Sequence, residues 1–255
     1  MKVIGLIPAR MASSRFPGKP LCKILGKPMI EHVYRRATMY PGWTKLGLTT
    51  CDREIADFGN SNGWDVIMTS DKHTRCLDRI AEAAPKFDSD LKDDDIIVCV
   101  QGDEPMLYPN MIDAVVKPLL DDKDVNCTVL AMDIVDEDVF KHKDTVKIVH
   151  NLKGDVLYTS RSPVPWCEKF SVELGAKRIY GIFAFRWHFL RTFTNLPESP
   201  LEIKESCDSN RMFDYGLKQR IAPYQFVQSF SVDNPGDVRK VEEGMSADPF
   251  YKMYS

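Results

Sequence analysis

A cluster of cations follows the first apolar segment of the chain. Residues 3–7 form a continuous apolar run, which is typical of a strand buried on both faces of a parallel sheet. The next residues include three cations within ten positions, Arg10, Arg15 and Lys19, and small residues that allow a tight loop, Ser13, Ser14 and Gly18. Ligands of open α/β sheets bind at the carboxyl ends of strands, and a bound triphosphate needs positive charge and free backbone N–H groups. The segment therefore indicates a phosphate-binding loop, although three scattered cations alone would also fit a solvated basic loop.

Two common phosphate-binding motifs do not describe this loop. A Walker A loop has glycine five residues before its Gly-Lys pair and Ser or Thr after it. Here the first position is Ser13, and Pro20 follows Lys19. The GxGxxG pattern of dinucleotide-binding proteins is absent from the sequence. The loop must therefore be of another kind.

A carboxylate follows the most apolar segment of the chain. Residues 96–100 are predicted to form a buried strand, and Gln101, Gly102 and Asp103 come directly after it. Fixed negative charge beside a phosphate loop requires a cation, and Mg²⁺ prefers one or two carboxylates together with phosphate oxygens and water. Asp103 is therefore predicted to bind Mg²⁺. The alternative is a turn or helix-capping role before the helix that begins near Pro109.

Strand and helix patterns alternate along the first half of the chain. Strands are predicted over residues 3–7, 46–50, 65–69 and 96–100, and helices over 28–37, 53–58, 75–84 and from 109 onward. Such alternation is typical of βαβ units. The sequence therefore predicts an α/β protein with a Rossmann-like fold, in which helices flank a mostly parallel sheet.

The pattern changes after about residue 125. Strands are predicted over 128–132 and 146–150, and the turn residues of 151–155 make 156–159 a hairpin partner of the latter. Further on, the patterns predict a helix over 211–218, a strand over 225–232 and a closing helix after Pro235. We expect one domain over residues 1–255, with a mixed α+β insert over roughly 125–200.

Five motifs in matching order resemble those of the enzymes that activate acidic sugars with CMP. The first is the loop itself, Pro-Ala-Arg followed by Ser-x-Arg-x-Pro-Gly-Lys-Pro-Leu and Gly-Lys-Pro-Met-Ile, and the second is Gln-Gly-Asp-Glu-Pro at 101–105. The others are Tyr-Thr-Ser-Arg-Ser-Pro-Val-Pro-Trp at 158–166, Ser-Pro-Leu-Glu at 199–202 and Val-Asp-Asn-Pro at 232–235. The chain resembles most the CMP-Kdo synthetases, which are 3-deoxy-manno-octulosonate cytidylyltransferases with a Rossmann-like nucleotidyltransferase fold. The resemblance spans nearly the whole chain.

The resemblance implies a magnesium-dependent cytidylyltransferase that joins CMP from CTP to a small acid and releases pyrophosphate. It implies that Asp233 is the second Mg²⁺ ligand, with helix capping as the alternative role and Asp237 as the reserve ligand. Arg10, Lys19 and Asp103 are expected to be catalytic. The expected nucleotide-binding residues are Pro8, Ala9, Arg10, Ser13, Arg15, Lys19, Arg79 and Gln101. The expected acceptor-binding residues are Gln101, Arg161, Glu202 and Glu205, although Glu is also common at helix N-termini.

The chain departs from the family pattern at three places. His-x-Ser-Gly-Thr-Glu-Arg becomes residues 73–79, in which Arg75 and Cys76 replace the Ser-Gly pair. The His and Tyr that precede the family's Tyr-Arg become Ile179 and Phe183, and Glu-Gln-Leu-Arg becomes residues 208–211. Contacts to Kdo hydroxyls would be lost at Ile179 and Phe183, which have no polar side-chain atoms. The acceptor therefore stays open among Kdo, 8-amino-Kdo, another ulosonic acid, and a phosphonate or phosphate acid.

Two other classes of function compete with this hypothesis. Enzymes that use a sugar 1-phosphate with UTP or dTTP usually carry a Gly-x-Gly-Thr-Arg loop, whereas this loop reads Arg-Met-Ala-Ser-Ser-Arg. A non-catalytic nucleotide-binding protein would have no reason to keep Arg10, Lys19, Asp103 and Asp233 together.

The composition of the chain limits the kinds of partner that we expect for the protein. The 255 residues are 44% hydrophobic and carry a formal net charge of −3, which does not suggest nucleic-acid binding. The seven cysteines form no CxxC pair, so free thiols in a reducing compartment are expected. The sequence shows no signal peptide and no membrane-spanning segment. We therefore expect a cytoplasmic protein without membrane or nucleic-acid partners. The resemblance further implies a homodimer, an insert at roughly 125–200 that contributes to acceptor binding and dimerisation, and a part in lipopolysaccharide biosynthesis.

Overall fold

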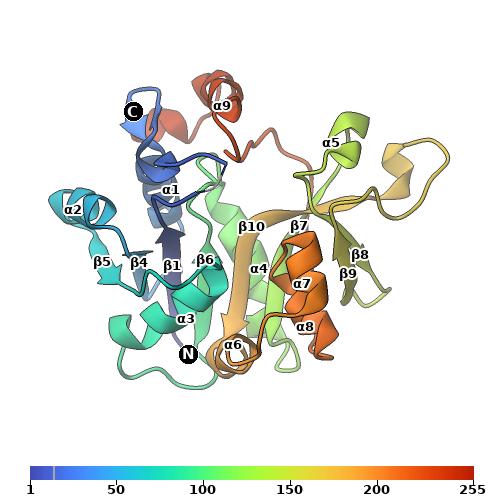
Figure 1. The fold of residues 1–255 in the computed structure, drawn as a ribbon, viewed down its shortest axis with the longest axis horizontal. Helices are drawn as coiled ribbons and strands as arrows, with labels where there is room; N and C mark the ends of the chain where they lie inside the picture. Colours follow the sequence, from blue (N-terminus) through green and yellow to red (C-terminus); the bar gives the residue numbers. More distant parts are fainter. Residues whose placement is uncertain (14) are drawn as a thin grey trace. The chain divides into compact units, whose positions relative to one another are not determined.

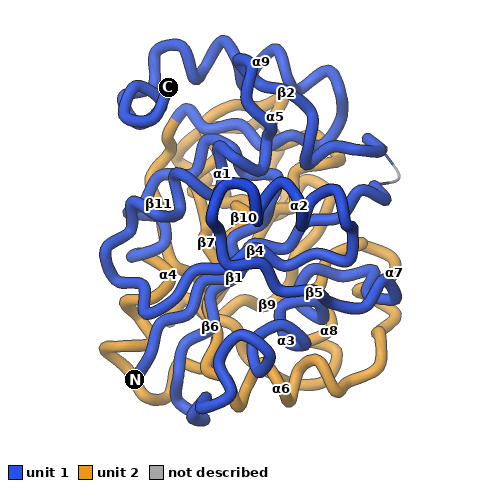
Figure 2. Tube along the Cα trace, turned by 90° about the vertical axis from the view of Figure 1, so that its left-hand side faces the viewer, with its two compact units in different colours: residues 1–113, 228–255 blue, residues 114–227 orange. Residues whose placement is uncertain are grey.

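The computed structural model describes residues 1–13 and 15–255, so Ser14 of the predicted loop lies outside the described residues. The chain forms two compact units (Figure 2). The first comprises residues 1–113 and 228–255, and the second comprises residues 114–227. The predicted 125–200 insert falls inside the second unit. The two units are described separately below.

The sheet of the first unit is parallel. Its strands lie in the order β6 (Ile96–Val100), β1 (Val3–Ala9), β4 (Lys45–Thr50) and β5 (Asp65–Met68), as Figure 1 shows. Every residue of β1 and β6 is buried. This burial agrees with the continuous apolar runs from which both strands were predicted, because strands of parallel sheets are covered on both faces. The chain thus has the α/β fold that the sequence predicts.

Helices follow the strands of the first unit. They are α1 (Met29–Thr38), α2 (Arg53–Ser61), α3 (Cys76–Phe87) and α9 (Asp237–Ser246), with the short 3₁₀ turns η1 (Lys19–Leu21) and η3 (Tyr251–Met253), while α4 (Pro109–Asp121) crosses the boundary between the units. The helical pattern predicted over 28–37 is confirmed, since Ile30, Val33 and Ala37 have no exposed surface. Pro28 caps α1 and ends a small hairpin of β2 (Lys23–Ile24) and β3 (Lys27–Pro28).

The C-terminal segment returns to the first unit and is fastened to α1. Arg36 donates through Nη2 to Asp248 Oδ2 at 2.7 Å and through Nε to the Tyr254 hydroxyl at 3.1 Å. The side chains of Arg36 and Asp248 are both buried. Removing one member of such a buried pair leaves an uncompensated charge, which is strongly destabilising. The pair therefore holds residues 228–255 on the unit that carries the predicted phosphate loop.

The second unit is mixed. Strand β7 (Cys127–Asp133) lies between β11 (Arg220–Tyr224), which is parallel to it, and β10 (Lys177–Arg186), which is antiparallel. β8 (Lys147–His150) pairs with β10 and with β9 (Val156–Ser160), so the predicted hairpin is confirmed. The remaining elements are α5 (Glu137–Lys141), η2 (Val172–Leu174), α6 (Trp187–Thr194), α7 (Pro200–Glu205) and α8 (Ser209–Asp214).

Two predictions for the later part of the chain are wrong. No strand covers residues 225–232, and the strand lies earlier, at β11. β11 contains Pro223, which interrupts a strand pattern in the sequence but is tolerated at the edge of a sheet. The helix predicted over 211–218 is α8, which starts at Ser209 and ends before Gly216, a residue with a φ of 72°.

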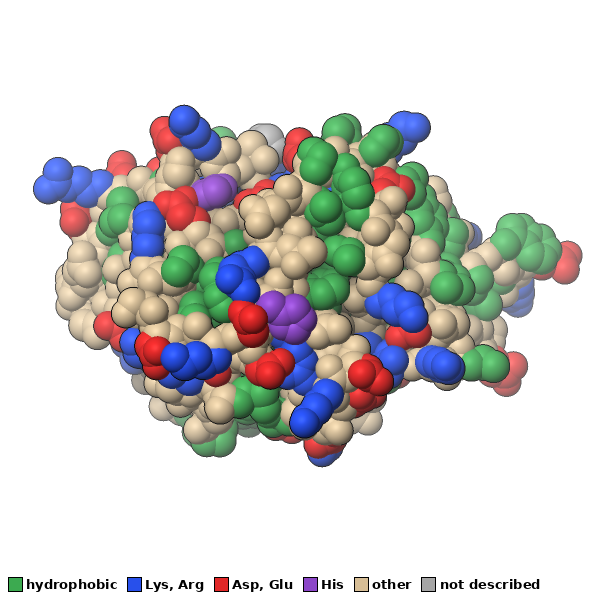
Figure 3. Space-filling model, turned by 90° about the horizontal axis from the view of Figure 1, so that it is seen from below, with side chains coloured by type: hydrophobic (Ala, Val, Ile, Leu, Met, Phe, Trp, Pro, Cys, Tyr) green, Lys and Arg blue, Asp and Glu red, His purple; other side chains and the backbone are tan. Residues whose placement is uncertain are grey.

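The described helices include none that is both long and apolar enough to cross a lipid bilayer. On the face shown in Figure 3, basic and acidic side chains are interspersed, in keeping with the small net charge.

Candidate active site

Two neighbouring strands of the first unit deliver the predicted site residues to one edge of its sheet. β1 ends at Ala9 and leads into the basic loop, and β6 ends at Val100, just before Gln101 and Asp103. The two strands are paired and parallel, so both carboxyl ends lie at the same edge. Gly102 allows this approach, because a Cβ atom there would lie 2.7 Å from the carbonyl oxygen of Pro8. The sequence pattern that predicted a shared edge is thus realised.

The basic loop is closed by its own backbone. The N–H groups of Ser13 and Gly18 both donate to the carbonyl oxygen of Met11, at 2.9 Å each. Met11 is held in turn, since its N–H donates to Asp52 Oδ2 at 2.7 Å. Gly18 has a φ of 75°, a conformation that favours glycine. These contacts fix the places from which the loop's cations project.

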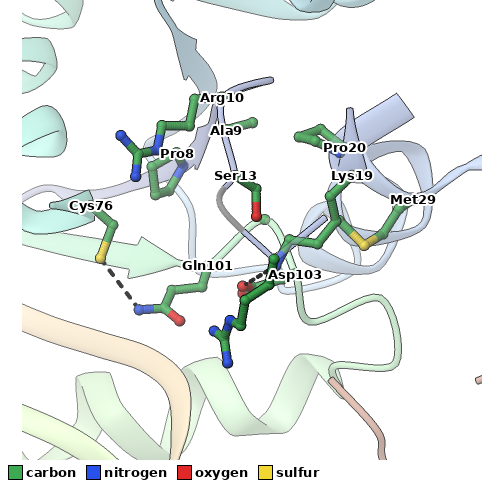
Figure 4. Close-up of a pocket in the computed structure, with 12 residues that line it drawn as sticks. Pro8, Ala9, Arg10, Ser13, Lys19, Pro20, Met29, Cys76, Gln101 and Asp103 are labelled. Carbon is green, nitrogen blue, oxygen red and sulfur yellow. Dashed lines mark hydrogen bonds and ion pairs between the residues drawn. The ribbon is translucent and has the colours of Figure 1, made fainter. Parts of the chain in front are cut away.

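A cavity of about 260 Å³ lies against this loop. Figure 4 shows the side chains of Arg10, Lys19, Gln101 and Asp103 around it. Among the residues that the structure describes, the lining comes from the first unit and consists of Pro8, Ala9, Arg10, Ser13, Arg15, Lys19, Pro20, Met29, Cys76, Gln101, Gly102 and Asp103. All of the predicted nucleotide-binding residues except Arg79 line it.

Lys19 connects the loop to the predicted metal-binding carboxylates. Its Nζ donates to Asp103 Oδ2 and to the carbonyl oxygen of Val232, both at 2.8 Å. Burial alone would lower the pKa of this ammonium, but the charge and hydrogen bond of Asp103 and the charge of Asp233 together raise it. Lys19 therefore stays protonated at neutral pH and adds a fixed positive charge to the cavity.

The C-terminal segment brings Asp233 beside Asp103. The N–H of Val232 donates to the carbonyl oxygen of Asp103 at 3.0 Å. This backbone contact brings Asp233, the next residue, close to Asp103. Asp233 Oδ1 accepts from Arg15 Nη2 at 2.7 Å. Asp237 has another task, because its Oδ2 accepts from the N–H groups of Asp233 and Asn234, both at 2.9 Å. These contacts fix the backbone just before α9, which begins at Asp237.

The two carboxylates suit a hard divalent cation. No group of three or more His, Cys, Asp or Glu side chains among residues 1–13 and 15–255 could hold a metal by itself. Mg²⁺ is commonly bound by one or two carboxylates and completes its shell with phosphate oxygens and water. Asp103 and Asp233, beside a cavity lined by Arg10, Arg15 and Lys19, fit that requirement.

Arg79 does not line the cavity but orders a segment next to it. Its side chain is buried and donates to Thr69 Oγ1 at 2.6 Å and to the carbonyl oxygen of His73 at 3.2 Å. Arg10 Nη1 donates to the same His73 carbonyl at 3.4 Å. The contacts of Arg79 thus order the segment 69–73, which orients Arg10. Its prediction as a direct nucleotide ligand stays untested.

Glu82 holds the other side of the same segment. Its carboxylate accepts from the N–H of Ser70, from Lys86 Nζ and from the imidazole of His73. Burial acts to raise its pKa, but these hydrogen bonds outweigh burial and lower the pKa of Glu82 to about 2. Sequence reasoning missed this residue, because a Glu on a helix face with a Lys four residues later is usually a surface pair.

The predicted acceptor residues Arg161 and Glu205 lie together in the second unit. Arg161 Nε donates to the carbonyl oxygen of Glu205 at 2.7 Å, and the backbone N–H of Arg161 donates to Glu205 Oε2 at 2.8 Å. Glu205 Oε1 also accepts from the hydroxyls of Tyr158 at 2.6 Å and Ser160 at 2.9 Å. Burial raises the pKa of Glu205, but these hydrogen bonds outweigh it and lower the pKa overall. The motif at 158–161 therefore ends in an ordered polar cluster.

Glu202 has the contacts of a structural residue. It has no exposed surface, its carboxylate forms a capping box with Ser199, and both of its oxygens accept from Arg211 at 2.7 Å. These contacts match the alternative of a helix N-terminal acid and give no support to an acceptor-binding role. Ile179 and Phe183, the positions that depart from the Kdo pattern, lie on β10.

Comparison with known proteins identifies the family. Residues 4–221 match the model of the family described as cytidylyltransferase. A 3-deoxy-manno-octulosonate cytidylyltransferase of Syntrophotalea carbinolica is 38% identical over 250 residues, which cover 95% of this chain and 98% of that protein. The protein of the same name from Nitratidesulfovibrio vulgaris is 40% identical over 237 residues, 92% of each chain.

A solved structure agrees with these relatives. The structure of CMP:2-keto-3-deoxy-manno-octonic acid synthetase complexed with CTP superposes with a TM-score of 0.85 and 34% sequence identity, and the match covers 96% of this chain and 99% of that one. With the family model and the full-length relatives, this similarity confirms the resemblance inferred from the motifs: the chain belongs to the cytidylyltransferase family.

Proposed function

We propose that the protein transfers CMP from CTP to 3-deoxy-manno-octulosonate or a closely related acid and releases pyrophosphate. The observation that carries the proposal is the cavity at the paired ends of β1 and β6, which is lined by Arg10, Arg15, Lys19 and Asp103, while Asp233 is bound to Arg15. Three cations suit the charge of a triphosphate, and two carboxylates suit a divalent ion. Full-length relatives named for this reaction support the choice of nucleotide and acceptor.

In the proposed reaction, a hydroxyl oxygen of the acceptor attacks the α-phosphorus of CTP. A new oxygen–phosphorus bond forms, the bond between the α-phosphorus and the bridging oxygen breaks, and the hydroxyl proton leaves to solvent. Phosphoryl-type transfer depends mainly on positioning and on charge neutralisation. Lys19 and Arg10 would stabilise the charge that builds on the α-phosphate and on pyrophosphate, and Arg15 would hold the outer phosphates.

Mg²⁺ is part of this proposal. Asp103 and Asp233 would hold the ion, which supplies Lewis-acid neutralisation of phosphate charge when bound. In the structure, Lys19 forms an ion pair with Asp103 at 2.8 Å, and Arg15 forms one with Asp233 at 2.7 Å. When the nucleotide binds, Lys19 and Arg15 can bind phosphate oxygens in place of the carboxylates. The carboxylate oxygens then become available to the metal ion. The chain's own residues can thus couple phosphate binding to metal binding.

The acceptor site is proposed on the motifs. Gln101 lines the cavity, and Arg161 with Glu205 forms a polar cluster in the second unit. The Arg161 guanidinium donates to the carbonyl oxygens of Lys143, Glu205 and Ser206, so it also orders the backbone segments around it. Homodimerisation and cytoplasmic location stay predictions.

A second acceptor is favoured by one feature of β10. Ile179 and Phe183 carry no polar side-chain atoms where the Kdo enzymes have His and Tyr. A site without those donors and acceptors would discriminate less for Kdo hydroxyls. We therefore include 8-amino-Kdo, other ulosonic acids and phosphonate or phosphate acids as candidate acceptors.

Pyrophosphate release from purified protein tests the proposal. The assay contains Mg²⁺ and CTP with Kdo, 8-amino-Kdo, sialic-type acids, phosphonates or sugar 1-phosphates, and UTP replaces CTP as the nucleotide control. Release with CTP and one acid is expected. Equal rates with UTP and a sugar 1-phosphate would contradict the proposal. If no acceptor gives release, calorimetry of CTP binding distinguishes a protein that binds the nucleotide from an inactive preparation.

A further inference from the structure

Cys76 places a thiol in the cavity at a position where the family pattern has glycine. It is the first residue of α3, it is half-buried, and it lines the cavity together with Gln101. A glycine would leave open space here. The side chain therefore adds a contact to the site that the family motif does not contain.

The contact is directed at Gln101. Gln101 Nε2 donates to Cys76 Sγ at 3.3 Å, and Figure 4 shows the amide nitrogen turned toward the sulfur. Sulfur is a weak acceptor, but a carboxamide has only two useful orientations about its last torsion. One weak bond can therefore select between them when no other strong partner holds the amide nitrogen.

The selected orientation decides what Gln101 can recognise. An amide presents its two hydrogen-bonding atoms on opposite sides, with nitrogen as the donor and oxygen as the acceptor. With Nε2 turned to Cys76, Oε1 faces the opposite side of the amide, where it can accept a hydrogen bond from a ligand. Its partner must be a donor, such as a sugar hydroxyl or an amine.

We infer that Cys76 is a positioning residue that sets the Gln101 amide so that its oxygen accepts from a hydroxyl or amine of a bound substrate. The inference rests on the proposed function and deepens it, since it names the polarity of the group read at this point of the site. Either CTP, through a ribose hydroxyl, or the acceptor can supply the donor. Cys76 itself needs no contact with either.

Steady-state kinetics of four variants test this. Wild type is compared with Cys76→Ala, Cys76→Ser, Gln101→Ala and the double variant, using CTP, Mg²⁺ and the acceptor found in the panel. Cys167, a half-buried thiol of the second unit, supplies the matched control as Cys167→Ala. Thermal melting of each protein verifies that the variants are folded.

We expect Cys76→Ala to raise the KM of one substrate about three- to tenfold, with kcat within about twofold, because one net hydrogen bond is lost. Cys76→Ser should restore most of the loss, since a hydroxyl also accepts from the amide. The double variant should match Gln101→Ala, because a residue that acts only through another adds nothing once its partner is removed. The substrate whose KM changes identifies the source of the donor.

Two results would overturn the inference: kinetics of Cys76→Ala equal to wild type, or a double variant that loses the product of both single effects. A wild-type protein that turns over no acceptor would refute the proposed function separately. In that case CTP is the only remaining source of the donor, so the CTP dissociation constants of the same proteins decide about Cys76, and equal constants in wild type and Cys76→Ala reject its role.

Discussion

Ion pairs of the candidate active site differ from a buried ion pair of the second unit in how far water can reach them. In the first unit, the side chains of Lys19 and Asp103 are 12% and 30% exposed, and those of Arg15 and Asp233 are 47% and 30% exposed. In the second unit, the Arg211 and Glu202 side chains are 2% and 0% exposed. Each pair has donor–acceptor distances of 2.7–2.8 Å, so the geometry is similar while the surroundings are not.

The difference separates pairs that can exchange partners from pairs that cannot. An accessible cation can leave its carboxylate for a phosphate at little cost, because exposed pairs contribute little net stability. A buried pair cannot part without leaving a desolvated charge, which costs several kcal/mol. The presence of an Arg and a Glu in a motif therefore does not show whether the pair serves catalysis or stability until the exposure of the side chains is known. We expect substitutions in the first class to change catalysis and in the second to change stability.

The largest effect is expected at the buried pair. Glu202→Gln leaves Arg211 charged and half-paired in the interior, so the free energy of unfolding should fall by about 3–5 kcal/mol. Urea unfolding followed by circular dichroism measures it. Glu168→Gln, at an exposed acid of the same unit, is the control and should change stability by less than about 0.5 kcal/mol. A stable Glu202→Gln protein with a raised acceptor KM would restore Glu202 as an acceptor ligand.

The next effect is expected at Asp103. Asp103→Asn removes a charge from the carboxylate pair that would hold Mg²⁺, and kcat should fall by about 10²- to 10³-fold, as for the loss of other groups that stabilise transition-state charge. The melting temperature should stay within a few degrees, because this pair is accessible. Pyrophosphate release and thermal melting measure both, with the exposed Asp57→Asn as control. Turnover within tenfold of wild type would exclude Asp103 from the site.

The sequence predicted the parts of this site that depend on local pattern. Continuous apolar runs identified β1 and β6, and residues that directly follow a strand were placed at the edge of a parallel sheet. The neighbourhood of Asp103 and Asp233 followed only from the family motif, because it depends on a backbone contact between residues 103 and 232.

Contacts with backbone groups account for what the sequence did not give. Arg79 and Arg161 donate mainly to backbone carbonyl oxygens, such as those of His73 and Lys143. Any residue type can supply a carbonyl, so no pattern of side chains marks such a partner. For the same reason, the strand around Pro223 was placed too late in the chain, since its pairing with β7 depends on an edge position.

Arg15 tests whether the accessible pairs exchange partners. Arg15→Ala removes a phosphate ligand, so the KM for CTP should rise about tenfold, which corresponds to about 1.4 kcal/mol. Binding of Mn²⁺ without nucleotide should become tighter, because Asp233 no longer has Arg15 as a counter-ion. Calorimetry with Mn²⁺ alone measures this second effect, and Arg53→Ala, at an exposed cation of α2, is the control. Weaker Mn²⁺ binding in Arg15→Ala would contradict the exchange.

A comparably small effect is expected at Glu82, whose side chain is 25% exposed. Its pKa is lowered to about 2 in the folded protein, so the unfolded chain binds the proton more tightly. The stability that Glu82 contributes is therefore present above about pH 4.5 and is lost as the pH falls toward 2. The free energies of unfolding of wild type and Glu82→Gln should differ by about 1–2 kcal/mol at pH 6 and should converge over that window. Urea titrations at several pH values measure the difference, with Glu54→Gln, an exposed acid of α2, as control. A difference that does not depend on pH would mean that shape, rather than the charge of Glu82, holds the segment that orients Arg10.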